Sequence, residues 1–256
     1  MVSAFRLPLC GLVGLTLALP LTTSAAEWCE APRRLEQVAA DDFRAGLTRW
    51  RLEAEDARAV VTADRGTLDI ATPAGLSLWW REPLSGDYAI RFSATALPAP
   101  VSAGPHAGRI SDLNMFWNAL EADGAEPHPR SGRFAGYDDL PTYYAGFGAN
   151  ANTTTRLRLY DGSRRRLLAG FADASIAEPG EQPMTPQTRL HLAKPLAIEI
   201  VSRRPTATDP VHLLWSADGR AVFTRTDPQP RLQGYFALRT TASRLQIRDF
   251  QILQCR

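Results

Sequence analysis

Short segments in which apolar and polar residues alternate with a period of two run through most of this chain, and they limit its fold more than any other feature. Gly, Pro, Asn and Asp gather between these segments, as they do in turns between strands. The sequence carries no long apolar stripe of helical spacing. The chain is therefore predicted to be all-β, with strands at 50–55, 59–63, 67–71, 77–81, 87–95, 111–120, 143–148, 155–160, 196–202, 211–216, 221–225, 234–240 and 245–253.

The expected strands show no internal repeat, which favours two packed antiparallel sheets over a propeller. The Asp-Gly pair at 218–219 is typical of a tight hairpin between two of them. No linker-like stretch divides the chain, and about 230 residues after residue 26 suit one sandwich with a full core. We predict a single domain over residues 27–256, a two-sheet antiparallel jelly-roll sandwich.

The N-terminal segment predicts export. Residues 1–6 carry one positive charge, and residues 7–21 are mostly apolar but too few to span a bilayer comfortably. Small residues at 22–26 fit a signal-peptidase site, so residues 1–26 are expected to be a signal peptide and Glu27 the first mature residue. A short membrane anchor is the alternative, but no stop-transfer charges follow. We expect a periplasmic or secreted protein with no membrane contact after cleavage.

Export decides how the three cysteines are interpreted. Cys10 leaves with the signal peptide, which leaves Cys29 and Cys255 at opposite ends of the mature chain. An even pair in an oxidising compartment predicts a disulfide, with two free thiols as the alternative. Such a bond would hold the two ends of the domain side by side.

The charge of the chain excludes some partners. Lys and Arg number 29 against 27 Asp and Glu, and removal of Arg6 leaves 28 against 27, a net charge of +1. Neither nucleic acid nor an acidic membrane is favoured by so small a charge. We expect a monomer that needs no cofactor, although a structural calcium ion in an acidic loop stays open.

Alternation also predicts which side chains share the outer face of each strand. That outer set combines aromatic rings, arginines, Asn and Asp, a mixture that suits a sugar with an apolar ring face and many hydroxyls. An arginine could also pair with the carboxylate of a uronate. Ordinary solvent-facing side chains are the alternative. The predicted outward residues are Trp79, Arg81, Arg91, Asp112, Asn114, Phe116, Asn118, Tyr144, Arg156, Arg158, Tyr160, Tyr235 and Arg239.

From this set we predict the functional residues. Asp112, Asn114, Tyr144, Arg156 and Arg158 are expected to share one groove. Asp112, Tyr144 and Arg158 are the catalytic candidates. The candidates for substrate binding are Asn114, Arg156, Trp79, Arg81, Arg239 and His106.

Two long segments without strand patterning, 98–110 and 122–142, are either functional loops or solvated insertions. The second contains most of a Glu-x-Asp-x-x-Glu spacing at Glu121, Asp123 and Glu126, which jelly-roll glucanases use to place two carboxyls on one strand. Gly124 and Pro127 favour a turn there instead. We therefore disfavour a glucanase site at this motif.

Several motifs resemble a secreted bacterial family of unknown function in the concanavalin A-like lectin and glucanase (laminin G-like) superfamily. The central ones are SDLNMFW at 111–117, GYDDLPTYYAGFG at 136–148 and NTTTR at 152–156. The opening residues 41–50 and 86–88 and the closing segment GYFALRTT at 234–241 are similar to the first and last strands of such domains. The resemblance implies a concanavalin A-like jelly roll found among polysaccharide-degrading proteins. It implies no particular reaction.

Three functions remain open at this point. A polysaccharide lyase would use arginine and Asn114 to stabilise an enolate-like charge while Tyr144 or a histidine moves the proton. A glycoside hydrolase would use carboxylates such as Asp112, Glu121 or Asp139. A carbohydrate-binding module would bind without cleaving. The density of titratable groups favours an enzyme over a binding module.

Overall fold

The structure is a computed structural model, and it describes residues 28–30, 33–228 and 231–256. The predicted signal peptide, residues 1–26, and its cleavage site lie outside the described residues. No helix within the described ranges is long and apolar enough to cross a membrane.

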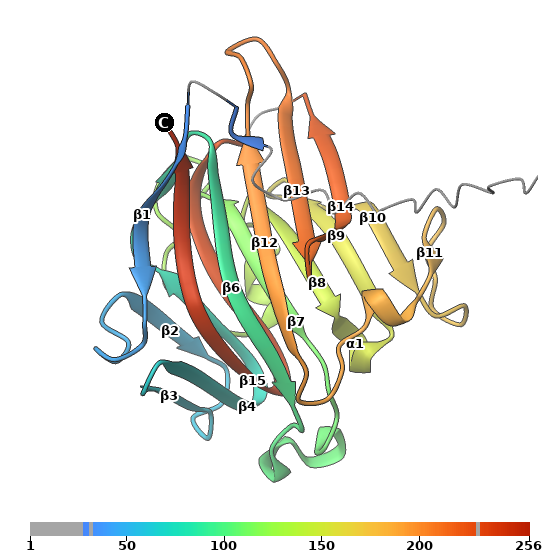
Figure 1. The fold of residues 1–256 in the computed structure, drawn as a ribbon. Helices are drawn as coiled ribbons and strands as arrows, with labels where there is room; N and C mark the ends of the chain where they lie inside the picture. The colour runs from blue at the N-terminus through green and yellow to red at the C-terminus, as the bar shows by residue number, and fades with distance from the viewer. Residues whose placement is uncertain (1–27, 31–32, 229–230) are drawn as a thin grey trace, which may run out of the picture.

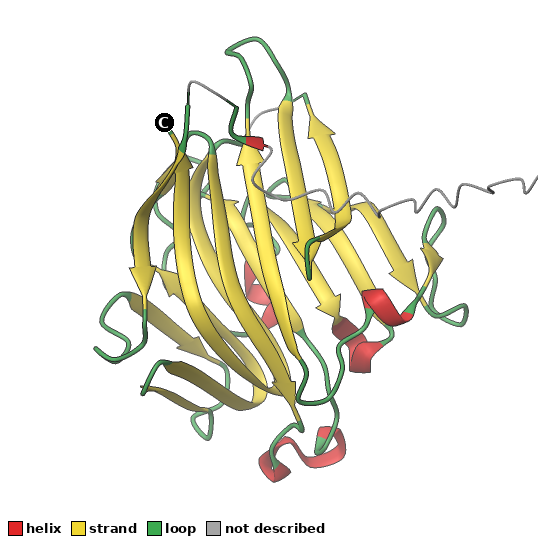
Figure 2. Cartoon of the chain, viewed as in Figure 1, coloured by secondary structure: helices red, strands yellow, loops and turns green. Residues whose placement is uncertain are grey.

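Strands make up nearly all of the regular structure, and the helical segments are short pieces at strand ends and in loops (Figure 2). The strands are β1 (Leu35–Asp41), β2 (Trp50–Ala54), β3 (Val60–Asp64), β4 (Thr67–Trp80), β5 (Leu84–Ser85), β6 (Tyr88–Leu97), β7 (Leu113–Ala119), β8 (Thr142–Gly148), β9 (Thr154–Tyr160), β10 (Arg165–Ala172), β11 (Gln182–Pro183), β12 (Pro195–Arg203), β13 (Val211–Ala217), β14 (Arg220–Asp227) and β15 (Gln233–Cys255). The helical segments are η2 (Val101–His106), η3 (Phe134–Tyr137), α1 (Ala149–Asn152) and η4 (Pro186–Thr188).

The strands form one antiparallel sheet, apart from the short parallel β11, that curls into two packed layers (Figure 1). The strand order is β11-β10-β9-β8-β7-β15-β6-β12-β13-β14. The layer that contains β7, β8, β9 and β10 is called here the β7–β10 sheet, and the layer that contains β6, β12, β13 and β14 is called the β12–β14 sheet. The all-β jelly-roll prediction is confirmed.

Strand β15 belongs to both layers. Its first part pairs with β7 and with the end of β4, and its later part pairs with β6 and β1. The register shifts between Thr241 and Ser243, and Ala242 between them has φ of 44°. This bulge lies where the strand passes from one layer to the other.

The main hydrophobic core lies between the two layers, and the predicted alternation explains it. Leu113, Met115 and Trp117 of β7 are buried there, as are Leu157 and Leu159 of β9. The hairpin at 218–219 forms as expected, with positive φ at both residues. The predicted strands at 67–71 and 77–81 form one continuous strand, β4. Those at 234–240 and 245–253 likewise form the single strand β15.

Some strand predictions were wrong or incomplete. Strands β1 and β10 were missed because neither alternates cleanly along its length. Asn118 was predicted to face outward, but with φ of 52° its side chain accepts a hydrogen bond from Tyr88 and donates one to Ser202. Its side chain is buried, contrary to the expectation.

The predicted disulfide between Cys29 and Cys255 is present, with 5.6 Å between the two Cα atoms. It links the start of the described chain to the end of β15, and β1 pairs with that same end. The first and last described segments therefore lie side by side, as the cysteine pattern indicated.

The segment 120–142 covers part of the outer face of the β7–β10 sheet rather than extending into solvent. Tyr137 and Leu140 of this segment are fully buried and pack with Trp79 and Phe116 of the sheet in a second hydrophobic cluster. Gly132 allows this approach: it has φ of +83°, and a Cβ atom there would lie 2.7 Å from the backbone nitrogen of Glu55. Most of the segment is exposed, and these buried residues attach it to the sheet.

Candidate functional site

The part of the outer face that segment 120–142 leaves open is a groove of about 440 Å³ over β7, β8 and β9. All five residues predicted to share one groove line it. The lining consists of Arg109, Asp112, Asn114, Phe134, Tyr144, Gly146, Ala149, Asn150, Arg156, Arg158, Arg165, Glu178 and Thr241. The alternation of three neighbouring strands is what brings these polar side chains to one face.

Asp112 lies at one end of the groove, where the chain enters β7 with φ of 66°. Its carboxylate accepts hydrogen bonds from Arg109 at 2.7 Å and from the Ser111 hydroxyl at 2.9 Å. Burial raises the pKa of Asp112, and the charge of Arg109 opposes that shift. Arg109 itself is fixed by the backbone carbonyls of Thr241 and Ala242, so this end of the groove is rigid.

Asn114 and Tyr144 occupy the middle of the groove floor. The amide oxygen of Asn114 is buried and has no hydrogen-bond partner among the described residues, while its nitrogen is 3.4 Å from Asp112. Gly146 makes room for it, because a Cβ atom there would lie 3.1 Å from that oxygen. Asn114 is only 2 % exposed, more buried than the outward prediction implied.

The ring of Tyr144 packs against Phe116 and Phe134, with ring centroids 5.0 and 5.6 Å away. Within the described residues its hydroxyl forms no hydrogen bond. Burial raises the pKa of Tyr144, although the charges of Arg239 and Arg158 oppose that shift. Tyr144 is therefore a neutral phenol whose hydroxyl remains available to a ligand.

Arg156 forms one wall and is already paired. It donates two parallel hydrogen bonds to Glu181, at 2.6 and 2.7 Å, and these raise the pKa of the guanidinium. Gly170 on β10 lies opposite Arg156 and leaves the space for that carboxylate, since a Cβ atom there would clash with Glu181. Arg156 therefore shapes the groove, and the N–H groups that it shares with Glu181 are not free to bind a ligand.

Arg158 and Arg165 are held more loosely. Arg158 has one contact to Glu178, at 3.3 Å, and Glu178 is half exposed and shared with Arg156. Arg165 pairs with Asp138 at the rim and lies over the ring of Phe134, 4.2 Å from its centroid. Both arginines therefore keep N–H groups that the described protein does not use.

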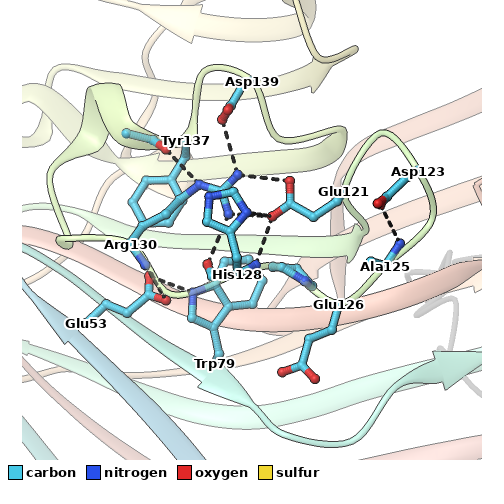
Figure 3. Close-up of polar contacts among 12 residues, drawn as sticks. Glu53, Trp79, Glu121, Asp123, Ala125, Glu126, His128, Arg130, Tyr137 and Asp139 are labelled. Carbon is cyan, nitrogen blue, oxygen red and sulfur yellow. Dashed lines mark hydrogen bonds and ion pairs between the residues drawn. The ribbon is translucent and has the colours of Figure 1, made fainter.

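The covered part of the same face is organised around Glu53 (Figure 3). Its carboxylate accepts hydrogen bonds from the indole of Trp79 at 3.0 Å, the hydroxyl of Tyr137 at 2.6 Å and the backbone N–H of Arg130 at 3.1 Å. Arg51 lies 3.4 Å from the same carboxylate. The polar groups around this buried carboxylate are thus largely satisfied by the protein itself.

The Glu-x-Asp-x-x-Glu motif lies above this network and forms a turn, as predicted. Glu121 pairs with Arg130 at 2.7 Å and also contacts the ring of His128 (Figure 3). Partial burial favours a higher pKa for Glu121, but the hydrogen bonds from Arg130 and His128 outweigh it and hold this pKa below its usual range. Glu126 pairs separately with Arg51. Neither glutamate lines the groove.

Four predicted binding residues lie outside the groove. Trp79 and Arg239 are on the expected face but are buried beneath segment 120–142, at 2 % and 1 % exposed. Arg81 follows the end of β4, and His106 lies in η2. For Trp79 and Arg239 the cause is that alternation assigns a face to each residue but does not show which part of that face a loop covers. Arg81 and His106 are exposed and lie beyond the strands that form the groove.

The groove also contains residues that the sequence reasoning missed: Arg109, Phe134, Arg165 and Glu178. Phe134 and Glu178 lie outside the regular strands and Arg109 precedes β7, so strand periodicity carries no signal for them. The long segments 98–110 and 122–142 were a weak signal, since they supply Arg109 and Phe134. Across the described ranges, no group of three or more His, Cys, Asp and Glu side chains could hold a metal ion.

A family profile described as "Domain of unknown function (DUF6250)" matches residues 70–250. Comparison with curated proteins finds no match. Among solved structures, a protein of unknown function with a galectin-like fold from Bacillus subtilis is similar, with a TM-score of 0.63 and 15% identity over 86% of this chain and 98% of that one.

Two further solved structures share the fold. An endo-β-1,3-glucanase from Pyrococcus furiosus has a TM-score of 0.55 and 10% identity, over 88% of this chain and 96% of that one. A mutant form of the Emp46p carbohydrate recognition domain has a TM-score of 0.51 and 12% identity, over 83% of this chain and 91% of that one. At such low identities the likeness shows the galectin-like, jelly-roll fold alone.

Proposed function

The chain belongs to the family described as Domain of unknown function (DUF6250), and we propose that it binds a carbohydrate in the groove over β7, β8 and β9. One observation carries the proposal: unpaired polar groups lie beside aromatic rings there. The amide oxygen of Asn114 and the hydroxyl of Tyr144 have no protein partner among the described residues, and Phe134 and Tyr144 offer apolar surface. Sugars combine hydroxyls with an apolar ring face and so fit both kinds of group.

The shared fold supports the same ligand class. Two of the structures that resemble this chain are described as an endo-β-1,3-glucanase and a carbohydrate recognition domain. Their low identity to this chain transfers no residue roles. The proposal therefore depends on the groups in this groove.

Among cleavage reactions, a lyase-type elimination fits the groove better than hydrolysis by two carboxyls. Hydrolysis needs two carboxyl groups flanking the bond, one of them free to donate a proton. Of the described lining residues only Asp112 and Glu178 are acidic, and each is paired with arginine. The other carboxylates considered from the sequence, Glu121 and Asp139, both pair with Arg130 outside the groove.

For elimination, Tyr144 is the group that we assign to proton transfer. No histidine is among the lining residues described. The raised pKa keeps the phenol neutral, so it can donate its proton to the departing sugar oxygen while its own oxygen takes the proton from the carbon beside the sugar carboxylate. The C–H and C–O bonds break, a C=C bond forms, and Tyr144 ends as a neutral phenol again. Such an elimination requires a sugar that carries a carboxylate. Arg158 and the Asn114 side chain line the groove and could contact that carboxylate.

A polysaccharide panel tests binding and cleavage together. Retention of a polysaccharide supports the proposed binding, and a rise in ultraviolet absorbance from unsaturated ends supports the lyase. New reducing ends without that absorbance would point to a hydrolase. Tyr144→Phe should abolish cleavage, whereas Tyr235→Phe, on the same face but outside the groove, should not. Failure to retain any member of a broad panel would overturn the proposal.

We further propose that the protein is exported and that residues 27–256 form its single mature domain. The disulfide supports an oxidising compartment. Intact-mass measurement of periplasmic or culture material should give a chain that begins at Glu27. A mass that retains residues 1–26 would contradict this.

A further inference from the structure

The groove carries more positive than negative charge, and this points to the kind of sugar it binds. The inference rests on the proposed carbohydrate binding. Five arginines lie in or directly behind the groove: Arg109, Arg156, Arg158, Arg165 and Arg239. Their carboxylate partners are Asp112, Glu178, Glu181 and Asp138. Four carboxylates thus face five guanidinium groups.

Arg239 is the guanidinium without a carboxylate. Among the described residues it forms no ion pair, and only one of its terminal nitrogens is hydrogen-bonded, to the Ser77 hydroxyl and the Gly132 carbonyl. It is 1 % exposed and lies 4.8 Å from the centroid of Phe134. Burial without a counterion makes its charge act over a longer range than an exposed charge would.

Phe134 contacts this buried arginine and also lines the groove. Arg165 packs on the same ring, 4.2 Å from its centroid. Burial and the charge of Arg239 lower the pKa of Arg165. Two cations that share one aromatic ring repel each other, and an anion in the groove would reduce that repulsion.

The neighbouring arginine on β9 is also incompletely paired. Arg158 shares Glu178 with Arg156, and both contacts are 3.3 Å long. In the antiparallel pairing of β9 with β10, Arg158 lies opposite Leu167. Arg165 lies two residues before Leu167 on β10. Arg158 and Arg165 are therefore diagonal neighbours on one face, with unused N–H groups.

We infer that the groove binds an acidic saccharide whose anionic group contacts Arg158 and Arg165. Guanidinium groups bind carboxylate and sulfate oxygens through paired hydrogen bonds, so a uronate and a sulfated sugar share the required chemistry. The apolar face of the sugar would pack toward Phe134 and Tyr144. The Asn114 amide oxygen would accept a hydrogen bond from a sugar hydroxyl.

The test is the affinity of the exported protein for three polymers at low and high salt: polygalacturonate, a sulfated galactan and a neutral galactan. We expect at least one acidic polymer to bind about tenfold or more tightly than the neutral one, with an advantage that shrinks as salt screens the charges. A preference between the two acidic polymers identifies the anionic group, and either preference supports the inference.

Three variants locate the contact. Arg158→Gln and Arg165→Gln should each weaken binding of the acidic polymer by about tenfold and change binding of the neutral polymer by less than about twofold. Arg225→Gln makes the same charge change at an exposed position of β14 outside the groove and should have no effect. Thermal unfolding of each variant controls for folding.

Two results would overturn the inference while leaving carbohydrate binding intact. One is a neutral polymer that binds as tightly as the acidic ones without salt dependence. The other is acidic binding that Arg158→Gln and Arg165→Gln both leave unchanged. Absence of binding to every polymer in the broader panel would instead show that the proposed function itself is wrong.

Discussion

The two halves of the outer face of the β7–β10 sheet contain the same kinds of residue but differ in what lies over them: segment 120–142 covers one half, and the other is an open groove. In the covered half, Glu53 accepts hydrogen bonds from Trp79, Tyr137 and Arg130. In the open groove, the side chains of Asn114 and Tyr144 keep unused polar atoms. Residue type therefore does not identify a binding site on this face. What distinguishes the open groove from the rest of the face is the absence of a covering segment.

Replacement of Glu53 by Ala should have the largest effect on the covered half. It removes one buried carboxylate from several donors at once and leaves Trp79 and Tyr137 without their partner. We expect the free energy of unfolding to fall by about 4 kcal/mol. Urea unfolding measures it, with Glu126→Ala as the control because that carboxylate is half exposed and should cost less than about 0.5 kcal/mol. If Glu53→Ala lowered the free energy of unfolding as little as Glu126→Ala, Glu53 would not anchor segment 120–142.

A pair of glycines tests whether close approach holds the segment in place. Gly132 and Gly124 both have positive φ, but a Cβ atom would meet the backbone of residues 53–55 only at Gly132. Gly124→Ala should cost about 1 kcal/mol through backbone strain alone. Gly132→Ala should cost about 3 kcal/mol, because the clash adds to that strain. Similar melting temperatures for the two variants would contradict the close packing described above.

Two tyrosines should separate stability from binding. Tyr137→Phe removes a hydrogen bond to Glu53 and should lower the free energy of unfolding by about 2 kcal/mol, with no effect on sugar affinity. Tyr144→Phe should change stability by less than about 0.5 kcal/mol and weaken binding about tenfold, or ~1.4 kcal/mol. Calorimetry of unfolding and of binding on both variants gives the comparison. If Tyr137→Phe weakened binding and Tyr144→Phe lowered stability, the covered half would be the binding site and the groove a structural element.

The smallest expected difference is in acid stability. The pKa of Glu121 is lowered on folding, so its contribution to stability is complete above the ordinary glutamate value of 4.5 and is lost as the pH falls through the folded value. The pKa of Asp112 is raised, so its contribution has the opposite sign: it is complete below the ordinary aspartate value of 3.8 and is lost as the pH rises through the folded value.

Unfolding free energies measured between pH 6 and pH 3.5 therefore distinguish the two halves. Glu121→Gln should make stability fall less steeply on acidification. Asp112→Asn should make it fall more steeply, because a contribution that grows at low pH has been removed. The same change of slope in both variants would contradict the signs assigned here.

The sequence indicated the fold and part of the site because both depend on local alternation. Leu113, Asn114 and Met115 reach their correct faces through strand geometry alone. Segment 120–142 was not predictable in this way, since its position depends on contacts of Gly132 with residues far away in the chain. Arg165 was missed for a related reason: β10 lacks clear alternation, and its bulge near Leu167 is set by pairing with β9.

The central position of β15 has a consequence for how the chain acquires its structure. β15 follows the other described strands in the sequence, yet β1, β4, β5, β6 and β7 all pair with it. During synthesis from the N-terminus, these strands lack this partner until residues 233–255 have emerged. The pairings of β15, which join the two layers, can therefore form only after these residues are made. Deletion of residues 250–255 would leave the facing edges of β1 and β6 unpaired and exposed to aggregation.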